Sequence, residues 1–299
     1  MTPLVIYHAN CTDGFGAAYA AWKALGDGAE YFAAHYGDLD DPTTLEARFG
    51  TDIGKRDVYI LDFSLKRSGM DWLFEKAQRV VWLDHHRTAF EMWCGTPNVQ
   101  RHTKTQGKDY IVLDNDMSGA MLAWEYFHPE YTPAPMLIQC IDDRDRWQWK
   151  LPDSAAIHLA LQVNQPWNFK QWDYMRMHYS DLRATGAALM GYQNKQVQAS
   201  VEKARPCAIN PAPMTGAGIP GLAVNTPTHI SEVGNELAKK SGTYGLVWYF
   251  DGSAHRAFCS LRSIGDYDVS AIAKTFGGGG HKNAAGFNID MQTLLEWVK

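Results

Sequence analysis

Short apolar runs alternate with helix-forming segments along the first half of the chain. The apolar runs, each typical of a buried strand, are Leu4–His8, Val58–Leu61 and Val80–Leu83. The helix-forming segments are Gly14–Trp22, Arg67–Gln78 and Gly119–Phe127. Because strands that alternate with helices pair as βαβ units, this pattern predicts an α/β fold with a mostly parallel sheet flanked by helices.

The second half of the chain begins with helices. Met136–Leu161 has a helical pattern that is interrupted at Asp142–Asp145, and Asp181–Lys203 is compatible with a long connecting helix. Arg205-Pro206 and the Pro/Gly-rich stretch Asn210–Gly221 then break the pattern. Such a break indicates a domain boundary.

The residues after this boundary return to a smaller alternating pattern. The predicted elements are strands at Leu222–Val224, Gly245–Phe250, Ala254–Arg262 and Ala285–Ile289, and helices at Ile230–Lys240 and Val269–Phe276. We therefore expect three parts: a larger domain over 1–180, a connecting helix and linker over 181–206, and a smaller α/β domain over 207–299.

Composition and charge narrow the classes of function. The 299 residues carry 28 Lys+Arg against 33 Asp+Glu, a net charge of -5, which argues against tight binding of long duplexes and leaves room for a short anionic substrate. No apolar run approaches the roughly 20 residues of a membrane span, and the N-terminus lacks a secretory signal. The five scattered cysteines argue against a disulfide framework or structural zinc site, so we expect a cytoplasmic protein without a membrane partner.

Polar residues stand where the predicted strands end. His8 ends the first run, Asp62 follows the second, and Asp84-His85-His86 ends the third. Because ligands bind beyond the carboxyl ends of strands in open α/β sheets, we expect these side chains to converge. Carboxylates mixed with imidazoles suit Mn²⁺ or a similar divalent ion, and two ions bridged by a carboxylate fit this ligand supply.

Further carboxylates lie close by in the sequence, and their roles stay open at this point. Asp13 follows the first strand, and Asp142-Asp143-Arg144-Asp145 lies in a helical region. These groups are candidate metal ligands, but Asp13 is equally placed to cap the following helix. Asp142 or Asp145 is equally placed to pair with Arg144 or Arg146.

The second distinctive segment is the glycine run Gly277–Gly286. Glycines bring backbone N–H groups close to an anion, so we prefer a phosphate-binding loop over a plain hinge. The candidate substrate-binding residues are Arg262, Ser263, Gly278, Gly279, Gly280, His281, Lys282 and Asn283. The tryptophans Trp147, Trp149, Trp167 and Trp172 are candidates for base stacking, with core packing as the more common alternative.

These motifs resemble, in their order and spacing, the DHH phosphoesterase superfamily with its DHHA1 substrate-binding domain, and the resemblance covers nearly the whole chain. It implies a two-domain phosphoesterase with two Mn²⁺ ions in an active-site cleft between the domains. Mg²⁺ or another divalent ion is an alternative to Mn²⁺. Activities in the family include single-strand exonuclease action, degradation of short oligonucleotides, hydrolysis of 3′-phosphoadenosine 5′-phosphate, cyclic dinucleotide cleavage, and pyro- or polyphosphate hydrolysis.

The resemblance also implies roles for single residues. His8 and Asp13 would bind metal, and Asp62 would bridge the ions. His85 and one Asp of the Asp142-Asp143 pair would complete the site. Asp84 would bind metal or orient the site, and His86 would contact metal or the scissile phosphate as a catalytic residue. The glycine-rich loop with His281, together with Arg262, would hold the substrate.

One departure from the family pattern concerns the first motif. Relatives carry two or three acidic residues there, whereas His8-Ala9-Asn10-Cys11-Thr12-Asp13-Gly14 has one. Asn10 would bind as a neutral oxygen ligand, and Cys11 would either pack or, as a thiolate, shift the preference toward softer metals.

The resulting hypothesis is a metal-dependent phosphodiesterase acting on a short oligonucleotide or a small phosphorylated nucleotide. The alternatives are an inorganic pyrophosphatase or polyphosphatase, and a catalytically weak nucleotide-binding regulatory protein. The oligomeric state stays open, with a homodimer among the options.

Overall fold

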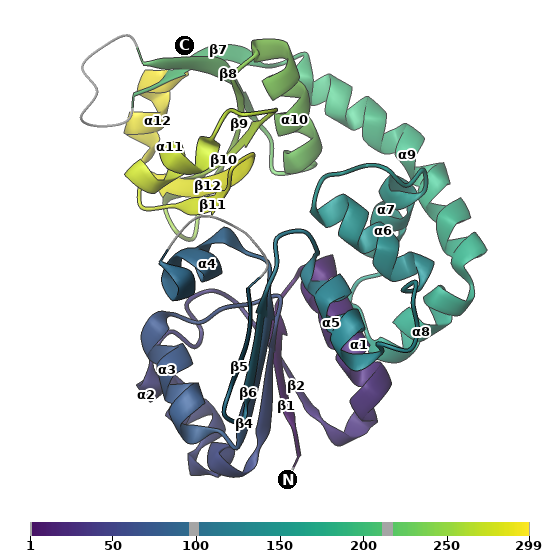
Figure 1. Ribbon diagram of the computed structural model, residues 1–299. Helices are drawn as coiled ribbons and strands as arrows, with labels where there is room; N and C mark the ends of the chain where they lie inside the picture. The colour runs from purple at the N-terminus through teal and green to yellow at the C-terminus, as the bar shows by residue number, and fades with distance from the viewer. Residues whose placement is uncertain (1, 96–101, 211–217, 299) are drawn as a thin grey trace. The chain divides into compact units, whose positions relative to one another are not determined.

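The computed structural model describes residues 2–95, 102–210 and 218–298. The chain divides into two compact units, Met1–Met190 and Gly191–Lys299, which we describe separately (Figure 1). The long helix α9 (Tyr179–Val201) runs through the division. Among the described residues, no helix has the length and apolar character that a bilayer crossing requires.

The first unit is built on a six-stranded sheet. Its strands are β1 (Leu4–His8), β2 (Glu30–Ala34), β3 (Asp57–Leu61), β4 (Arg79–Asp84), β5 (His102–Gln106) and β6 (Asp109–Leu113). They lie in the order β2-β1-β3-β4-β6-β5, and every neighbouring pair is parallel except the edge pair β5–β6. The predicted mostly parallel sheet is therefore confirmed. From β1 the chain adds β2 on one side and β3 on the other, so the strand order reverses there.

Helices cover both faces of this sheet. They are α1 (Thr12–Leu25), α2 (Pro42–Phe49), α3 (Arg67–Lys76), α4 (Arg87–Cys94), α5 (Gly119–Phe127), α6 (Met136–Asp145), α7 (Ser154–Val163) and α8 (Phe169–Met177), with short 3-10 turns at Gly26–Gly28 and Thr51–Lys55. Because side chains alternate along a strand, Val5 and Leu61 pack toward α1 and α5, while Ile6 and Ile60 pack toward α2 and α3 (Figure 1). The apolar runs thus form two cores, one on each face.

The second unit contains another six-stranded sheet. Its strands are β7 (Arg205–Ile209), β8 (Ile219–Asn225), β9 (Tyr244–Asp251), β10 (Arg256–Ser263), β11 (Gly279–His281) and β12 (Ala284–Ile289). They lie in the order β11-β12-β10-β9-β8-β7, antiparallel except for β8–β9. The helices α10 (Ile230–Ser241), α11 (Val269–Thr275) and α12 (Met291–Trp297) pack on it. Both units are therefore α/β, as predicted.

Three sequence expectations about local structure were wrong. Asp142–Asp145 does not interrupt a helix but forms the end of α6, and the break lies at 146–153. Arg205-Pro206 belongs to β7, where Pro206 is tolerated because β7 is an edge strand. Part of the glycine run is the short strand β11 rather than a loop. In the predicted break Asn210–Gly221, positions 211–217 lie outside the described residues.

Candidate metal centre

The polar residues that end three neighbouring strands meet at one edge of the first sheet. His8 is the last residue of β1, Asp62 follows β3, and His85 follows β4. Asp62 Oδ1 lies 3.1 Å from His85 Nε2, and Asp62 Oδ2 lies 3.7 Å from His8 Nδ1. This edge includes the point where the strand order reverses between β1 and β3, the usual ligand position in such sheets.

Potential metal-ligand atoms gather here in three overlapping sets. Within each set the ligand atoms lie within 4.8 Å of one another, and the sets are His8–Cys11–Asp62, Asp62–His85–His86 and Asp13–His85–Asp145. Asp62 belongs to two sets and His85 to two, so the sets form one continuous group. The arrangement can accommodate two ions, with Asp62 between them.

Asp62 is the residue that most clearly fits a cation. Its side chain is 1% exposed, and neither carboxylate oxygen has a well-aligned hydrogen bond, although the imidazoles of His85 and His8 lie 3.1 and 3.7 Å away. Its backbone has φ 52°, a left-handed conformation that costs energy for a residue with a side chain. A buried carboxylate that faces imidazoles without well-formed hydrogen bonds fits a metal ion shared with those imidazoles.

Asp13 is held in place by the start of α5. Its side chain is buried, with Oδ2 accepting from the Gly119 backbone N–H at 2.7 Å and Oδ1 from the Ala120 N–H at 2.9 Å. Oδ2 also lies 3.5 Å from His85 Nε2. Burial, followed by the charges of Asp62 and Asp145, raises the pKa of Asp13 well above its usual range. A carboxyl in these surroundings gains from a nearby cation.

Asp84 orients the histidine motif. Its Oδ1 accepts from the backbone N–H of His85 at 2.8 Å and of His86 at 3.2 Å, and lies 2.7 Å from His86 Nδ1. Asp84 Oδ1 thus orients the motif, whereas Oδ2 is buried without a hydrogen bond, so both predicted roles, metal ligand and orienting residue, stay predictions. Burial lowers the pKa of His86, but the charge and hydrogen bond of Asp84 outweigh it and raise the value to about 9.

The imidazole of His85 is surrounded by carboxylates. Burial and the neighbouring His86 lower the pKa of His85, but Asp62 and Asp145 outweigh them and raise it to about 9. Burial raises the pKa of Asp62, yet the adjacent imidazoles of His8 and His85 hold it well below its usual range. In the absence of an ion, protonated His85 therefore balances the negative charge of the group, and an ion bound there displaces that proton.

The carboxylates at the end of α6 require a correction. Asp145 Oδ2 lies 3.5 Å from His85 Nε2, whereas Asp142 and Asp143 are engaged elsewhere. Asp142 accepts from the Ser118 N–H at 2.7 Å and pairs with Arg146 at 3.4 Å. Successive helical residues point in different directions, and Asp143 faces the loop after α6. Among the carboxylates of α6, Asp145 rather than the predicted Asp142 or Asp143 therefore lies among the candidate ligand atoms.

Asp143 organises the loop between α6 and α7. Its carboxylate accepts from the Lys150 and Leu151 backbone N–H groups at 2.8 and 3.1 Å and from the Ser154 hydroxyl at 2.5 Å. In this loop Trp147 and Trp149 both have left-handed backbones, with φ 56° and 54°, and their rings meet edge to face at 4.9 Å.

The four candidate tryptophans fall into two groups. Trp172 is fully buried, and Trp167 donates its ring N–H to the Leu161 carbonyl, so both serve the core of the first unit. Trp149 is 37% exposed, and the Arg144 guanidinium lies 4.9 Å from the Trp147 ring. Only the second pair is placed to meet a base.

In the second unit, several predicted substrate residues form hydrogen bonds or ion pairs with other residues of the unit. Arg262 donates to the Ser231 hydroxyl at 2.9 Å. The Asn283 amide donates to Ser263 Oγ at 2.9 Å and to the Gly265 carbonyl at 3.1 Å. Lys282 pairs with Asp266 at 2.6 Å at the surface. Ser263 and Asn283 therefore have a structural role in this turn, whatever else they do.

The glycines of Gly277–Gly286 differ in whether the surrounding structure leaves room for a side chain. A Cβ on Gly278 would lie 2.1 Å from the Gly286 carbonyl oxygen, and one on Gly280 would lie 2.4 Å from the Ala284 oxygen, so β12 requires both glycines. A Cβ on Gly279 would meet no atom within 4 Å. His281 ends β11 and is partly buried. Gly279 is thus the glycine that the fold itself does not explain.

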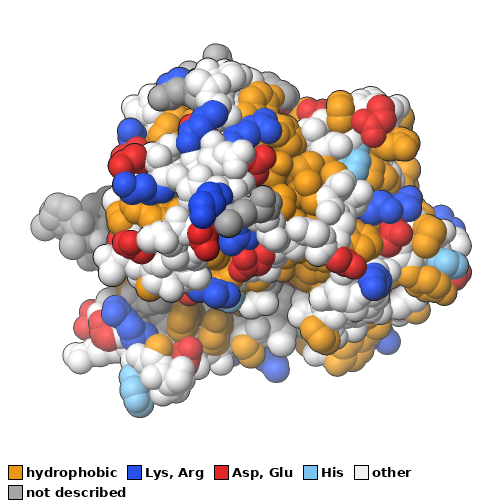
Figure 2. All heavy atoms as spheres, turned by 90° about the horizontal axis from the view of Figure 1, so that it is seen from below, with side chains coloured by type: hydrophobic (Ala, Val, Ile, Leu, Met, Phe, Trp, Pro, Cys, Tyr) orange, Lys and Arg blue, Asp and Glu red, His pale blue; other side chains and the backbone are white. Residues whose placement is uncertain are grey.

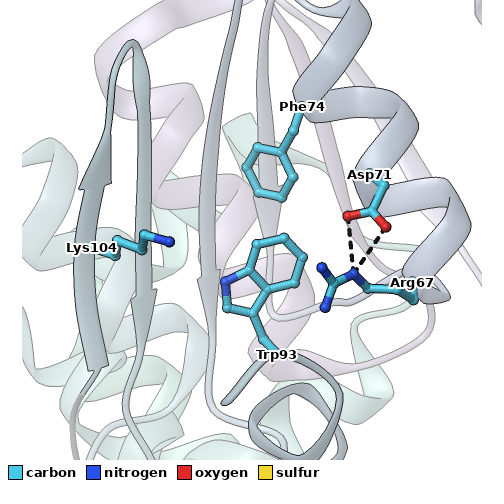
Figure 3. Close-up of a pocket in the computed structure, with 5 residues that line it drawn as sticks. All are labelled: Arg67, Asp71, Phe74, Trp93 and Lys104. Atoms are coloured by element: carbon cyan, nitrogen blue, oxygen red, sulfur yellow. Dashed lines mark hydrogen bonds and ion pairs between the residues drawn. The ribbon is translucent and has the colours of Figure 1, made fainter. Parts of the chain in front are cut away.

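Hollows outside the metal centre also occur among the described residues. One of about 450 Å³ in the second unit is lined by Gly277 and Gly278 together with the stacked rings of Tyr249 and Phe258. Another, of about 300 Å³, is lined in the first unit by Arg67, Asp71, Phe74, Trp93 and Lys104 (Figure 3). There the Arg67 guanidinium is already paired with Asp71 at 3.0 Å and lies 4.4 Å from the Trp93 ring, so we assign this hollow no ligand.

Sequence reasoning missed Gly119 as part of the centre. A Cβ on Gly119 would lie 2.3 Å from the Asp62 Cβ, so only glycine allows α5 to approach Asp62 while its N–H binds Asp13. The signal was present in the small residues Ser118-Gly119-Ala120 at the start of a predicted helix. The sequence pattern does not indicate, however, which residues they contact.

The chain is similar to known proteins in sequence. The DHHA1 domain family matches residues 222–299. Uncharacterized protein R106 of Acanthamoeba polyphaga mimivirus is 29% identical over 301 residues, a match that covers 95% of this chain and 66% of the viral protein. The chain thus spans just under two thirds of that relative's length.

Two solved structures extend the comparison. The pGpG-specific phosphodiesterase PggH of Vibrio cholerae is 12% identical with a TM-score of 0.51, covering 99% of this chain and 96% of that chain. RecJ of Thermus thermophilus, solved in complex with Mn²⁺, is 13% identical with a TM-score of 0.48, covering 98% of this chain and 50% of that chain. The likeness to PggH shows a shared fold along the chain, and the family match identifies its C-terminal part. Residues 222–299 are therefore identified as a DHHA1 domain, and the chain shares its fold with the phosphodiesterase PggH.

Proposed function

We propose that this protein is a metal-dependent phosphodiesterase that hydrolyses short nucleotide substrates with two divalent ions. The observation that carries the proposal is Asp62. It is a buried carboxylate without a well-aligned hydrogen bond, shared by two sets of ligand atoms at the edge of a parallel sheet. The DHHA1 match of residues 222–299 and the fold shared with the pGpG-specific phosphodiesterase PggH support the same class of reaction.

The residues around Asp62 fit two ions. Asp13, His85 and Asp145 would hold one, His8 with the opposite side of Asp62 would hold the other, and Mn²⁺ suits the oxygen-rich first set. Bound divalent ions activate water at neutral pH and neutralise charge on phosphoryl oxygens. The chain itself positions the ligands: α5 holds Asp13, and the left-handed backbone of Asp62 directs its carboxylate between the two sets.

His86 is the proposed contact to the scissile phosphate. Asp84 engages Nδ1, so Nε2 is the ring atom through which His86 would donate to a phosphoryl oxygen. Without bound ions, the Asp84 carboxylate outweighs burial and holds the pKa of His86 at about 9, and its contact with Nδ1 would favour the protonated ring that stabilises developing negative charge. The role we assign to His86 is therefore electrostatic.

Charge and aromatic groups favour a short nucleotide as substrate. The net charge is -5, and acidic and basic side chains are interspersed on the face shown in Figure 2 rather than separated into a basic stripe. Long strands bind through many phosphate contacts, which a net charge of -5 does not favour. Trp149, exposed two residues beyond Trp147 and four beyond Asp145, offers a ring for one base. On this proposal, Gly279 of the DHHA1 domain contributes to binding a substrate phosphate.

The test combines one substitution with a substrate panel. Asp62→Asn removes the charge, keeps the shape and suits the left-handed backbone, because asparagine tolerates that conformation. We expect kcat/KM with Mn²⁺ to fall by at least about 10²-fold while the fold persists. Asp71→Asn, at an exposed carboxylate paired with Arg67, is the matched control. Near-normal turnover by Asp62→Asn at limiting Mn²⁺ would refute the proposal.

The panel decides the substrate. It comprises a dinucleotide, 3′-phosphoadenosine 5′-phosphate, a cyclic dinucleotide, a long single strand and pyrophosphate. We expect the highest kcat/KM on one of the short nucleotides. Faster hydrolysis of pyrophosphate would replace the proposal with a pyrophosphatase, and faster processive degradation of the long strand with a single-strand exonuclease. Tight nucleotide binding without turnover at any metal would indicate a regulatory protein.

A further inference from the structure

We propose that Cys11 is a metal ligand, so that the two ion sites of this protein prefer different metals. His8, Cys11 and Asp62 would form a site with one nitrogen, one sulfur and one oxygen donor. Asp13, His85 and Asp145 would form a site of nitrogen and oxygen donors alone. The inference rests on the proposed metal centre, because Asp62 of the first site lies 3.1 Å from His85 of the second and would lie between the two ions.

The position of Cys11 supports a ligand role. Cys11 precedes α1 with an extended backbone, φ -118° and ψ 135°, and its side chain does not cap the helix. Its sulfur lies within 4.8 Å of the ligand atoms of His8 and Asp62. Ligand atoms around a tetrahedral Zn²⁺ stand roughly 3.5 Å apart, given bonds of about 2.0–2.3 Å. A shift of about 1 Å in these side chains is therefore enough to close the site.

Two further atoms point to a ligand at this place. Neither oxygen of Asp62, which is 1% exposed, has a well-aligned hydrogen bond, and His8 Nδ1, 3.7 Å from Asp62 Oδ2, is buried without one. Both belong to the same set as Cys11. Three potential ligand atoms that converge while two of them lack well-formed hydrogen bonds are better explained by a cation than by packing.

The other cysteines of the described chain differ from Cys11. Cys140 and Cys207 contact tyrosine hydroxyls at 3.3 and 3.6 Å, and Cys259 is buried in the core of the second unit. Cys94 ends α4, partly exposed and outside the three ligand sets. Cys94 therefore provides a control of the same residue type in the same unit.

A sulfur donor changes which metals the site selects. Thiolates favour Zn²⁺ and related softer ions, whereas Mn²⁺ prefers carboxylate oxygen. We therefore expect Zn²⁺ or Co²⁺ at the His8–Cys11–Asp62 site, and Mn²⁺ at the Asp13–His85–Asp145 site. As the metal–sulfur bond forms, the thiol proton is released to solvent.

Spectroscopy of the full chain tests this without any substrate. Metal-free protein is titrated with Co²⁺ while the near-ultraviolet thiolate-to-cobalt charge-transfer band is recorded. We expect the band to saturate with one equivalent per chain in the wild type and in Cys94→Ser. Cys11→Ser should lose the band and weaken Co²⁺ binding at that site by at least about tenfold, with an unchanged circular dichroism spectrum. A band that persists in Cys11→Ser, or is absent from a wild type that binds two Co²⁺, would overturn the inference.

A second variant asks whether sulfur decides the metal preference. Cys11→Asp replaces the thiol with a carboxylate and should move the site toward Mn²⁺, measured as Mn²⁺ retained in competition with Zn²⁺. An unchanged Mn²⁺/Zn²⁺ ratio would contradict the inference. The two proposals fail separately: a thiolate band without hydrolysis refutes the phosphodiesterase, while Mn²⁺-dependent hydrolysis without the band refutes Cys11 as a ligand.

Discussion

Gly119→Ala should disable the metal centre although it changes none of the ligands. Gly119 is the first residue of α5, and a Cβ there would lie 2.3 Å from the Asp62 Cβ and 2.7 Å from its Cγ. Carbon atoms in contact are usually about 3.5–4.0 Å apart, so Asp62 or α5 has to move by about 1 Å. Asp62 has little freedom to yield, because its backbone is already held in the left-handed region.

The expected magnitudes separate function from stability. A misplacement of about 1 Å in an active site can cost about 10²-fold in rate, so we expect kcat/KM to fall by that factor. Alanine gains about 1 kcal/mol of helix propensity over glycine, and overpacking costs about 1–3 kcal/mol. The net loss in the free energy of unfolding is therefore at most about 2 kcal/mol, and the variant stays folded.

The assay measures three quantities in Gly119→Ala: kcat/KM with Mn²⁺, metal content by elemental analysis, and the urea midpoint of unfolding. Gly191→Ala is the control, since a Cβ on that residue of α9 meets no atom within 4 Å. The control should keep activity and metal content and gain slightly in stability. If Gly119→Ala retains full metal content and wild-type kcat/KM, the close contact with Asp62 does not position the site, and the reasoning is refuted.

Three more outcomes follow from the structure. In EDTA, the free energy of unfolding should fall between about pH 6.5 and about pH 9, because His85 and His86 each have a pKa of about 9 when folded and 6.5 when unfolded. His85→Gln should remove the part that His85 contributes and so make the fall smaller, and a flat wild-type profile would contradict the reasoning. Gly278→Ala should lower the melting temperature, whereas Gly279→Ala should leave it unchanged and raise KM, so equal melting temperatures for the two variants would contradict the assignment. Trp149→Ala should raise KM for a dinucleotide but not for a phosphodiester without a base, and an equal effect on both would remove the proposed stacking.

The arrangement of the main elements could be predicted because it depends on simple patterns. Buried parallel strands are apolar on both faces, so Val58–Leu61 and Val80–Leu83 stand out, and polar residues directly after them mark the carboxyl edge. The strand β2 (Glu30–Ala34) was not predicted, because most of its residues are only partly buried and its pattern is weak. The edge strand β7 was hidden by Pro206, a residue that normally argues against a strand.

The choice among the carboxylates of α6 could not be made from the sequence. Asp142, Asp143 and Asp145 stand on one helical turn and point in directions roughly 100° apart for each residue. Which of them faces His85 depends on how α6 packs against the sheet, and that depends on contacts far away in sequence. Only the structure shows that Asp143 turns to the Lys150–Leu151 backbone and leaves Asp145 near His85.

Two glycines, Gly14 and Gly119, allow the first turns of α1 and α5 to pack closely against candidate ligand residues. A Cβ on Gly14, in the first turn of α1, would lie 2.2 Å from the His8 carbonyl oxygen, just as one on Gly119 would strike Asp62. In both places a helix begins against the residue that ends a strand and carries a ligand. Close approach lets the α5 backbone N–H groups hold Asp13 while Asp62 stays within 3.1 Å of His85. The small residues at the starts of these two helices therefore determine how close the ligand residues lie to one another. A larger residue at either position would move the ligand residues apart although none of them had been substituted.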